Sequence, residues 1–200
     1  SRAIAWYTAS FGVGAALSFS LAGFINGALG WQWAFGILGF GALGATILIL
    51  LTTRYQPPLQ QHESRRFLNV RAVLGNRPAL AYILSYTLHT TELMTIIAWA
   101  VTFLTFAASL QPAGSISIDV TIFGALVSFI AMPASIYGNE LARRFGRRQT
   151  VSLIMIVSAL FGCLAGFSAA MPFWIAVVML VMYSALSAAD SASITAGTVK

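Results

Sequence analysis

The chain has 200 residues, of which 58% are hydrophobic and only 8% are charged. Soluble domains carry about 25% charged residues, so this composition excludes a water-soluble globular protein and indicates a chain surrounded by lipid. The formal net charge is +6. The basic residues lie in short clusters between long apolar segments, a pattern of membrane proteins and not of nucleic-acid-binding surfaces, so we expect no nucleic-acid partner.

Six apolar segments are each long enough to cross the hydrocarbon core of a membrane, which takes about 20 residues of α-helix. They run over 3–25, 33–52, 79–108, 121–137, 150–170 and 172–195. The connections after the first and the fifth segments are only a few residues long, so these neighbours are predicted to form antiparallel hairpins. The sequence therefore predicts an all-α, polytopic helical membrane protein.

A polar linker over 54–78 divides the chain into two spans and four. Its middle part places Phe67, Val70, Val73 and Leu74 on one helical face. This spacing favours a short amphipathic helix at the membrane surface. A partly ordered linker is the alternative.

All eleven Lys and Arg residues fall on one side of a six-span layout. They precede the first span, follow the sixth, or lie between the second and third and between the fourth and fifth. The positive-inside rule places that side in the cytoplasm. We therefore expect a multi-pass protein of the plasma (inner) membrane, with the segments 54–78 and 138–149 cytoplasmic.

Two acidic residues and one histidine fall inside the predicted spans. Glu92 lies near the middle of the third span, and His89 precedes it by three residues on the same helical face. Asp190 belongs to a polar stripe in the sixth span, with Ser184, Ser187, Ser191, Ser193 and Thr195. An acidic residue at the membrane centre costs about 2.5 to 3.5 kcal/mol on insertion scales, so it usually faces the bundle interior or a water-filled cavity.

Burial favours the neutral form of a carboxyl group, so Glu92 can bind and release a proton, and His89 can share that role or bind substrate. The alternative is a His–Glu hydrogen bond that only satisfies two polar groups. Likewise, the stripe around Asp190 either lines an aqueous path or marks the cytoplasmic end of its span. We expect Glu92, His89 and Asp190 to be substrate or proton-coupling residues, and we expect no catalytic residue, metal site or cofactor.

The segment 138–148 resembles the cytoplasmic loop signature of the major facilitator superfamily, Gly-x-Leu-Ala-Asp-Arg-x-Gly-Arg-Arg, which lies between the second and third spans of each half. Leu141, Ala142, Arg144, Gly146, Arg147 and Arg148 match the signature. Gly138 precedes it, Asn139 takes the place of the first Gly, and Arg143 takes the place of the Asp. Gly146 is predicted to permit a tight reversal between two helices. A second segment, 30–35, resembles the Gly-Trp-Arg-x-x-Phe turn before the sixth span of this family.

Registered on this family, the chain corresponds to spans five to ten of twelve. Residues 1–53 then hold the last two spans of the N-terminal half, 54–78 the linker between the halves, and 79–200 the first four spans of the C-terminal half. The resemblance implies a secondary transporter, not an enzyme, that moves a small solute by alternating access. The expectation that it is proton-coupled comes from Glu92 within its span. The expected partners are the lipid bilayer, a small-molecule solute and protons. The alternative is a transporter-like membrane sensor that binds a ligand without moving it.

Overall fold

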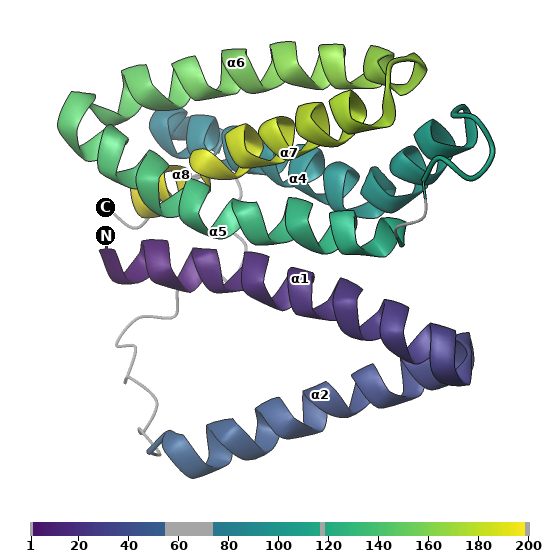
Figure 1. The fold of residues 1–200 in the computed structure, drawn as a ribbon. Coiled ribbons are helices and arrows are strands. Elements are labelled where there is room, and N and C mark those ends of the chain that lie inside the picture. Colours follow the sequence, from purple (N-terminus) through teal and green to yellow (C-terminus); the bar gives the residue numbers. More distant parts are fainter. Residues whose placement is uncertain (1, 55–73, 117–118, 199–200) are drawn as a thin grey trace. The chain divides into compact units, whose positions relative to one another are not determined.

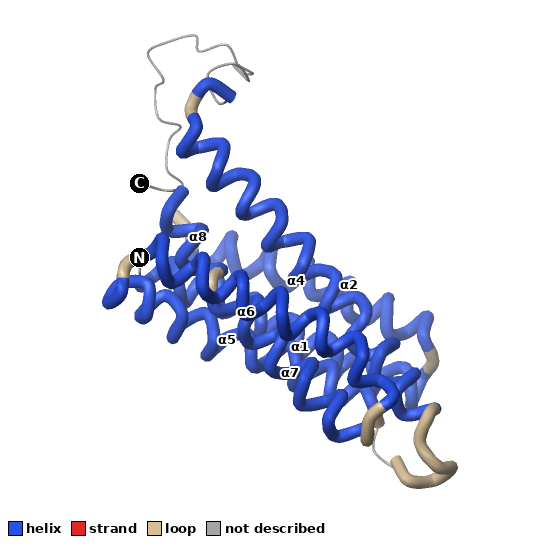
Figure 2. Tube along the Cα trace, turned by 90° about the horizontal axis from the view of Figure 1, so that it is seen from above, coloured by secondary structure: helices blue, strands red, loops and turns tan. Residues whose placement is uncertain are grey.

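The computed structural model describes residues 2–54, 74–116 and 119–198, and every regular element in these ranges is a helix. The elements are α1 (Arg2–Leu29), α2 (Trp31–Thr52), α4 (Arg77–Ser109), α5 (Val120–Phe145), α6 (Arg147–Phe167), the 3-10 turn η1 (Ser168–Ala170), α7 (Phe173–Ala189) and α8 (Ser191–Thr198). Figure 1 shows them in sequence colours, and Figure 2 distinguishes the helices from the described loops that join them. The amphipathic helix predicted around Phe67 and Val70 lies outside the described residues.

Six helical segments in the described ranges are long and apolar enough to cross a membrane. They are Ser10–Leu29, Trp31–Thr52, Arg77–Ser109, Val120–Phe145, Arg147–Ala170 and Phe173–Ala196. This confirms the prediction of an all-α, polytopic membrane protein. The main difference concerns the fourth span, which was predicted to end at residue 137 but continues as helix to Phe145.

The chain separates into two compact units, one formed by Ser1–Ser20 with Ala81–Lys200 and the other by Leu21–Leu80. In the smaller unit, α1 and α2 are joined through the single residue Gly30, whose φ is +92°. The aromatic rings of Trp31 and Phe35 meet edge to face at 6.5 Å on the first turn of α2. Among the described α2 residues only Ala34 is buried.

The core of the larger unit is an apolar cluster between α4, α5 and α7. From α4 it takes Ile96, Ala100 and Leu104, which recur every four residues and so share one helical face. Phe123 of α5 and Phe173 of α7 close the cluster with rings 5.5 Å apart in an edge-to-face arrangement. Such pairs contribute about 0.5–1.5 kcal/mol beyond their buried area.

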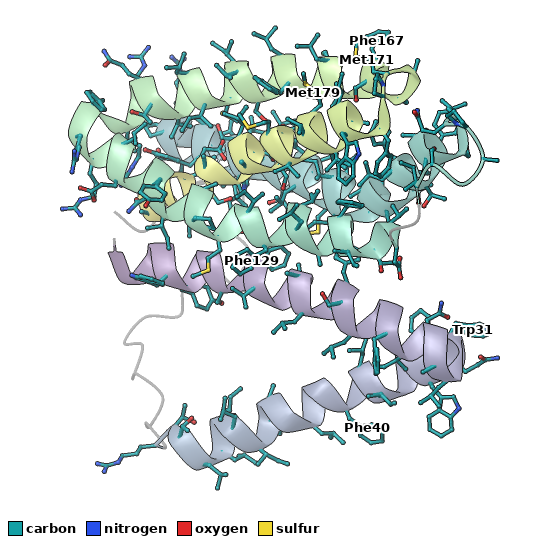
Figure 3. All side chains as sticks on the ribbon, in the orientation of Figure 1. Trp31, Phe40, Phe129, Phe167, Met171 and Met179 are labelled. Atoms are coloured by element: carbon teal, nitrogen blue, oxygen red, sulfur yellow. The ribbon has the colours of Figure 1, made fainter. Side chains whose placement is uncertain are left out.

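Large apolar side chains also cover the outside of both units. Phe167 is 79% exposed, Phe40 is 68% exposed, and Trp31 is 63% exposed, as their positions in Figure 3 illustrate. A soluble monomer rarely exposes continuous apolar area on this scale. These side chains are therefore the surface that the helices present to lipid.

Two connections in the larger unit fix the ends of α5. At its start, the Asp119 carboxylate accepts hydrogen bonds from the backbone amide of Thr121 at 2.9 Å and from its hydroxyl at 2.8 Å. The backbone bond and then the hydroxyl bond hold the pKa of Asp119 below its usual value. At its end, the single residue Gly146 with φ +91° joins α5 to α6. This conformation favours glycine, so the predicted tight reversal is confirmed.

Candidate functional site

Most of the signature segment is helical. Gly138, Asn139 and Ala142 are buried on α5, and Leu141 is exposed. The true connection is Gly146 alone, because Arg147 already begins α6. On the outer face, Glu140 forms ion pairs with Arg143 at 3.2 Å and Arg144 at 3.5 Å, while Arg148 is exposed. Arg143, which stands in the Asp position of the signature, is therefore paired one turn back along its own helix.

The last span is interrupted at Asp190. α7 ends at Ala189 and α8 begins at Ser191. The backbone amides of Ser193 and Ile194 both donate to the Asp190 carbonyl, at 3.0 and 2.9 Å. This tighter turn marks a local irregularity of the helix, and it places a carboxylate at the junction.

Gly138 of α5 packs directly against this interruption. A Cβ atom on residue 138 would collide with the Ala189 carbonyl group. Only a residue without a side chain allows the two backbones to approach so closely. From the sequence Gly138 was predicted to lie in a cytoplasmic loop, whereas in the structure it lies at the crossing of α5 with the α7–α8 junction.

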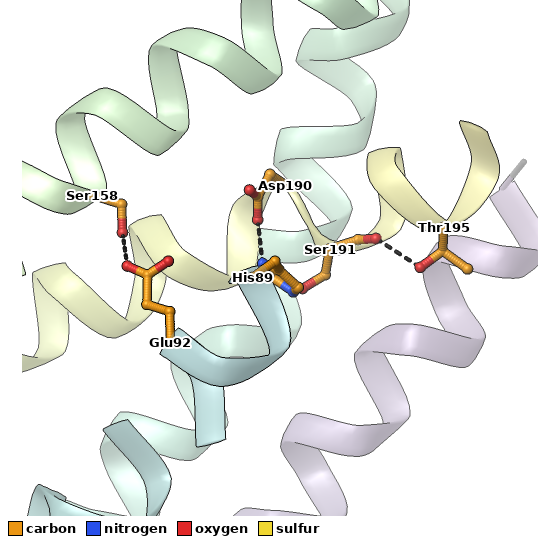
Figure 4. Close-up of polar contacts among 6 residues, drawn as sticks. All are labelled: His89, Glu92, Ser158, Asp190, Ser191 and Thr195. Carbon is orange, nitrogen blue, oxygen red and sulfur yellow. Dashed lines mark hydrogen bonds and ion pairs between the residues drawn. The ribbon is translucent and has the colours of Figure 1, made fainter. Parts of the chain in front are cut away.

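At the α7–α8 junction, His89 lies between Asp190 and Ser191, as Figure 4 shows. Its Nδ1 atom is 2.9 Å from Oδ1 of Asp190, and both side chains are only 3% exposed. Its Nε2 atom is 2.7 Å from the hydroxyl of Ser191. The Nδ1 and Oδ1 atoms are at ion-pair distance without hydrogen-bond geometry. In the neutral tautomer with the proton on Nδ1, Nε2 accepts the Ser191 hydroxyl proton.

Glu92 has different partners. Its Oε1 atom accepts a hydrogen bond of 2.7 Å from Ser158 of α6, which is 1% exposed, and Tyr183 of α7 also interacts with this carboxylate. Both ring nitrogens of His89 face Asp190 and Ser191, which leaves none to bond Glu92. The His–Glu hydrogen bond considered from the sequence is therefore replaced by two separate contacts.

A cavity of about 370 Å³ lies beside His89 within the larger unit. Its wall is rich in hydroxyl groups and in aromatic rings, and it includes Tyr7, Ser10, Phe11, Tyr86, His89, Thr90, Ser128, Ser135, Ser184, Ser191 and Thr195. Among the described lining residues there is no Lys or Arg, and Glu92 does not line it. Of the polar stripe predicted on the sixth span, Ser184, Ser191 and Thr195 face this cavity.

Two serines of α5 were missed by the sequence analysis. Ser128 and Ser135 are 4% and 3% exposed, line the cavity, and have hydroxyls without a hydrogen-bond partner among the described residues. Buried polar groups normally have partners, so these hydroxyls are available to a molecule in the cavity. Their spacing of seven residues, two helical turns on one face of an apolar span, was a signal that could have found them.

The major facilitator superfamily model matches residues 1–199 of the chain. No curated protein and no solved structure matches it. The match extends over the whole set of spans and confirms the resemblance seen in the signature segment. This is an integral, multi-pass membrane chain of the transporter class, and it belongs to the major facilitator superfamily.

Proposed function

We propose that this chain is part of a secondary transporter that couples the movement of a small solute to protons. The observation that carries the proposal is the buried pair of His89 and Asp190, 2.9 Å apart beside a hydroxyl-rich cavity. In this proposal His89 and Asp190 hold the transported proton, and the cavity holds the solute.

Electrostatics explain why such a pair suits a proton carrier. With neutral His89 and ionised Asp190, the pair carries one net negative charge in a site excluded from water. A proton on His89 brings the net charge to zero, which lowers the cost of keeping the pair in a low-dielectric environment. A site whose net charge changes by one on proton binding can favour different conformations in its two states.

The solute side of the proposal rests on the cavity wall. Ligand cavities combine apolar walls with a few polar groups that orient the ligand. Here Tyr86 and Phe11 supply aromatic surface, and Ser128 and Ser135 supply unpaired hydroxyls. Further apolar surface comes from Leu93, Met94 and Ile97. This wall suits a small solute that combines apolar surface with a few hydrogen-bonding groups.

The position and sidedness of the chain are parts of the same proposal. The resemblance supports spans five to ten of a twelve-span protein that works by alternating access. The basic residues of the α5–α6 connection support a cytoplasmic location for that end of the bundle, and those of 54–78 support the same for the linker. The host membrane is proposed to be the plasma (inner) membrane.

Glu92 is proposed as a second proton-binding group, less directly involved than the pair of His89 and Asp190. It lies within a span, but its hydrogen bond from Ser158 points it toward α6, and it does not line the cavity. A proton on Glu92 would therefore act on helix packing and not directly on a bound solute.

The test is a proton-flux measurement on the complete protein in liposomes that contain the pH dye pyranine. Sugars, amino acids, carboxylates and organic cations are added outside one at a time. We expect at least one of them to change the internal pH, and His89→Gln and Asp190→Asn to abolish this change. A solute-driven pH change that persists unaltered in both variants would remove the pair from the mechanism.

The sensor alternative gives a different result in the same preparation. A sensor would be stabilised against heat by one of these solutes without any movement of the radiolabelled solute into the liposomes. Uptake of the labelled solute by wild type is the result that excludes it.

A further inference from the structure

Ser191 lies next to His89 on the cavity wall. Its hydroxyl contacts Nε2 of His89 at 2.7 Å, and the same residue lines the cavity wall. A serine hydroxyl has one hydrogen to donate and two lone pairs with which to accept. Its single hydrogen can therefore serve either His89 or a molecule in the cavity, but not both.

The protonation state of His89 decides which of these it serves. When His89 is neutral with its proton on Nδ1, Nε2 is an acceptor and takes the Ser191 hydrogen. When His89 is protonated, Nε2 becomes a donor and Ser191 must accept. The Ser191 hydrogen is then released toward the cavity, where it needs an acceptor.

We propose that Ser191 reports the protonation of His89 to the solute by reversing the direction of this one hydrogen bond. This inference rests on the proposed function and deepens it. It implies that the solute places an acceptor oxygen, such as a carbonyl, carboxylate or hydroxyl oxygen, next to the Ser191 hydroxyl. Because an unpaired buried donor is costly, such a solute binds more tightly when His89 is protonated.

Reciprocity gives the sense of the coupling. If protonation of His89 raises the affinity for the solute, the bound solute raises the affinity of His89 for the proton by the same factor. Solute and proton then occupy the site together. This is the behaviour of a symporter, in which both move in the same direction.

The groups around His89 are consistent with a change of direction in the hydrogen bond to Ser191 alone. Among the described residues, the other titratable groups near His89 come from three elements. Tyr86, with its ring centroid 6.3 Å away, and Glu92 are on α4, and Asp190 is at the α7–α8 junction. Tyr7 of α1 lines the same cavity. Glu92 is engaged by Ser158, and α5 presents hydroxyls to the cavity. Asp190 faces Nδ1 in both states, so the change on protonation falls on Nε2.

Ser184 is a matched control on the same face of the same span. It also lines the cavity, but its hydroxyl donates to the backbone carbonyl of Val127 at 2.7 Å. That bond does not depend on His89. Removing the Ser184 hydroxyl therefore changes the cavity wall without removing the proposed switch.

The test uses the ligand-free complete protein with ¹⁵N-labelled histidine, in which His89→Gln assigns the His89 signals. The fraction of protonated His89 is measured by NMR at a fixed pH within about pH 5–8, the range where histidines titrate. The measurement is repeated with molar dimethyl sulfoxide, a small acceptor without a hydrogen-bond donor. We expect the ratio of protonated to neutral His89 to rise by about fivefold, the lower end of common coupling factors.

Ser191→Ala is expected to abolish this rise and Ser184→Ala to keep it. If Ser191→Ala does not fold, Ser191→Cys, of similar shape and with a weak donor, should reduce the rise. Two results would overturn the proposal. No rise in wild type would mean that the Ser191 hydrogen bonds its own helix and not the added acceptor. An equal rise in Ser191→Ala would mean that the rise does not depend on the Ser191 hydroxyl. If solute-driven proton flux is still observed alongside either result, the proposed function is retained and Ser191 has no part in it.

Discussion

At the scale of single residues, His89 and Glu92 lie on one helix but contact different neighbours. Three residues along an α-helix correspond to a rotation of about 300°, so the two side chains diverge by roughly 60°. In the middle of a bundle this angle separates the α7–α8 junction, which His89 contacts, from α6, which Glu92 contacts. Two polar groups that look like one pair in the sequence therefore belong to two sites.

The Glu92–Ser158 bond predicts a modest effect on stability. Glu92→Leu leaves the buried Ser158 hydroxyl without its acceptor, which costs about 1–3 kcal/mol in a rigid interior. Hydroxyls in membrane helices fall back on the carbonyl four residues earlier, and measured pairs there average about 0.6 kcal/mol. Because this fallback hydrogen bond offsets most of the cost, we expect the free energy of unfolding in detergent micelles to fall by about 0.5–1 kcal/mol.

Two further variants distinguish the effect of the Glu92–Ser158 hydrogen bond from the effect of the carboxylate charge. Glu92→Gln is expected to stay close to wild type, because its amide oxygen still accepts from Ser158. In the double variant Glu92→Leu/Ser158→Ala, the loss should be smaller than the sum of the two single losses. An equal loss in Glu92→Gln and Glu92→Leu would mean that the carboxylate charge, and not the hydrogen bond, stabilises the site.

At the scale of elements, the crossing of α5 with the α7–α8 junction depends on the missing side chain of Gly138. Gly138→Ala places a methyl group against the Ala189 carbonyl, and backbone cannot rotate away as a side chain can. Overpacking costs about 1–3 kcal/mol, and we expect the upper end here. Equilibrium unfolding in detergent, followed by circular dichroism, measures it.

Gly166→Ala is the matched control for this substitution. Gly166 is the penultimate residue of α6, and nothing stands within 4 Å of the place its Cβ would take. Exchanging glycine for alanine in a helix interior gains about 0.8–1 kcal/mol in helix propensity, and we expect a smaller gain of the same sign at this helix end. The two variants should therefore move stability in opposite directions, and a Gly138→Ala protein as stable as wild type would contradict the close crossing.

The elements show how far the sequence could predict this fold. The spans follow from apolar runs of sufficient length, which is a local property, and the reversal at Gly146 follows from a local signature. The helical state of 138–145 was missed because polar residues at a helix end resemble a loop in composition. The junction at Asp190 was missed because its turn depends on α5 packing across it, and no single segment encodes that contact.

The sequence indicates which polar residues lie inside the spans but not which of them contact each other. His89, Glu92 and Asp190 were identifiable because charge within a span is rare and costly. That Asp190 faces His89 while Glu92 faces Ser158 depends on the rotation of α4 relative to three other helices. The hydroxyls of Ser128 and Ser135 carry no charge, so they do not stand out among the other small residues of α5.

At the scale of the whole molecule, the one-sided basic residues predict which ends of the helices face the cytoplasm. Cys163 is an exposed native thiol, so the test begins from Cys163→Ala. Ser115→Cys, in the exposed turn after α4, should react with a membrane-impermeant maleimide on intact cells. Gln149→Cys, in the first turn of α6, should react only after the cells are permeabilised. The reverse labelling pattern would invert the proposed orientation.

The single residue between α5 and α6 also sets a mechanical limit. One residue spans at most about 3.6 Å, so the joined ends of these helices have no slack with which to slide past each other. The angle between the two helices can change only as a hinge at Gly146, which keeps the end of α5 next to the start of α6.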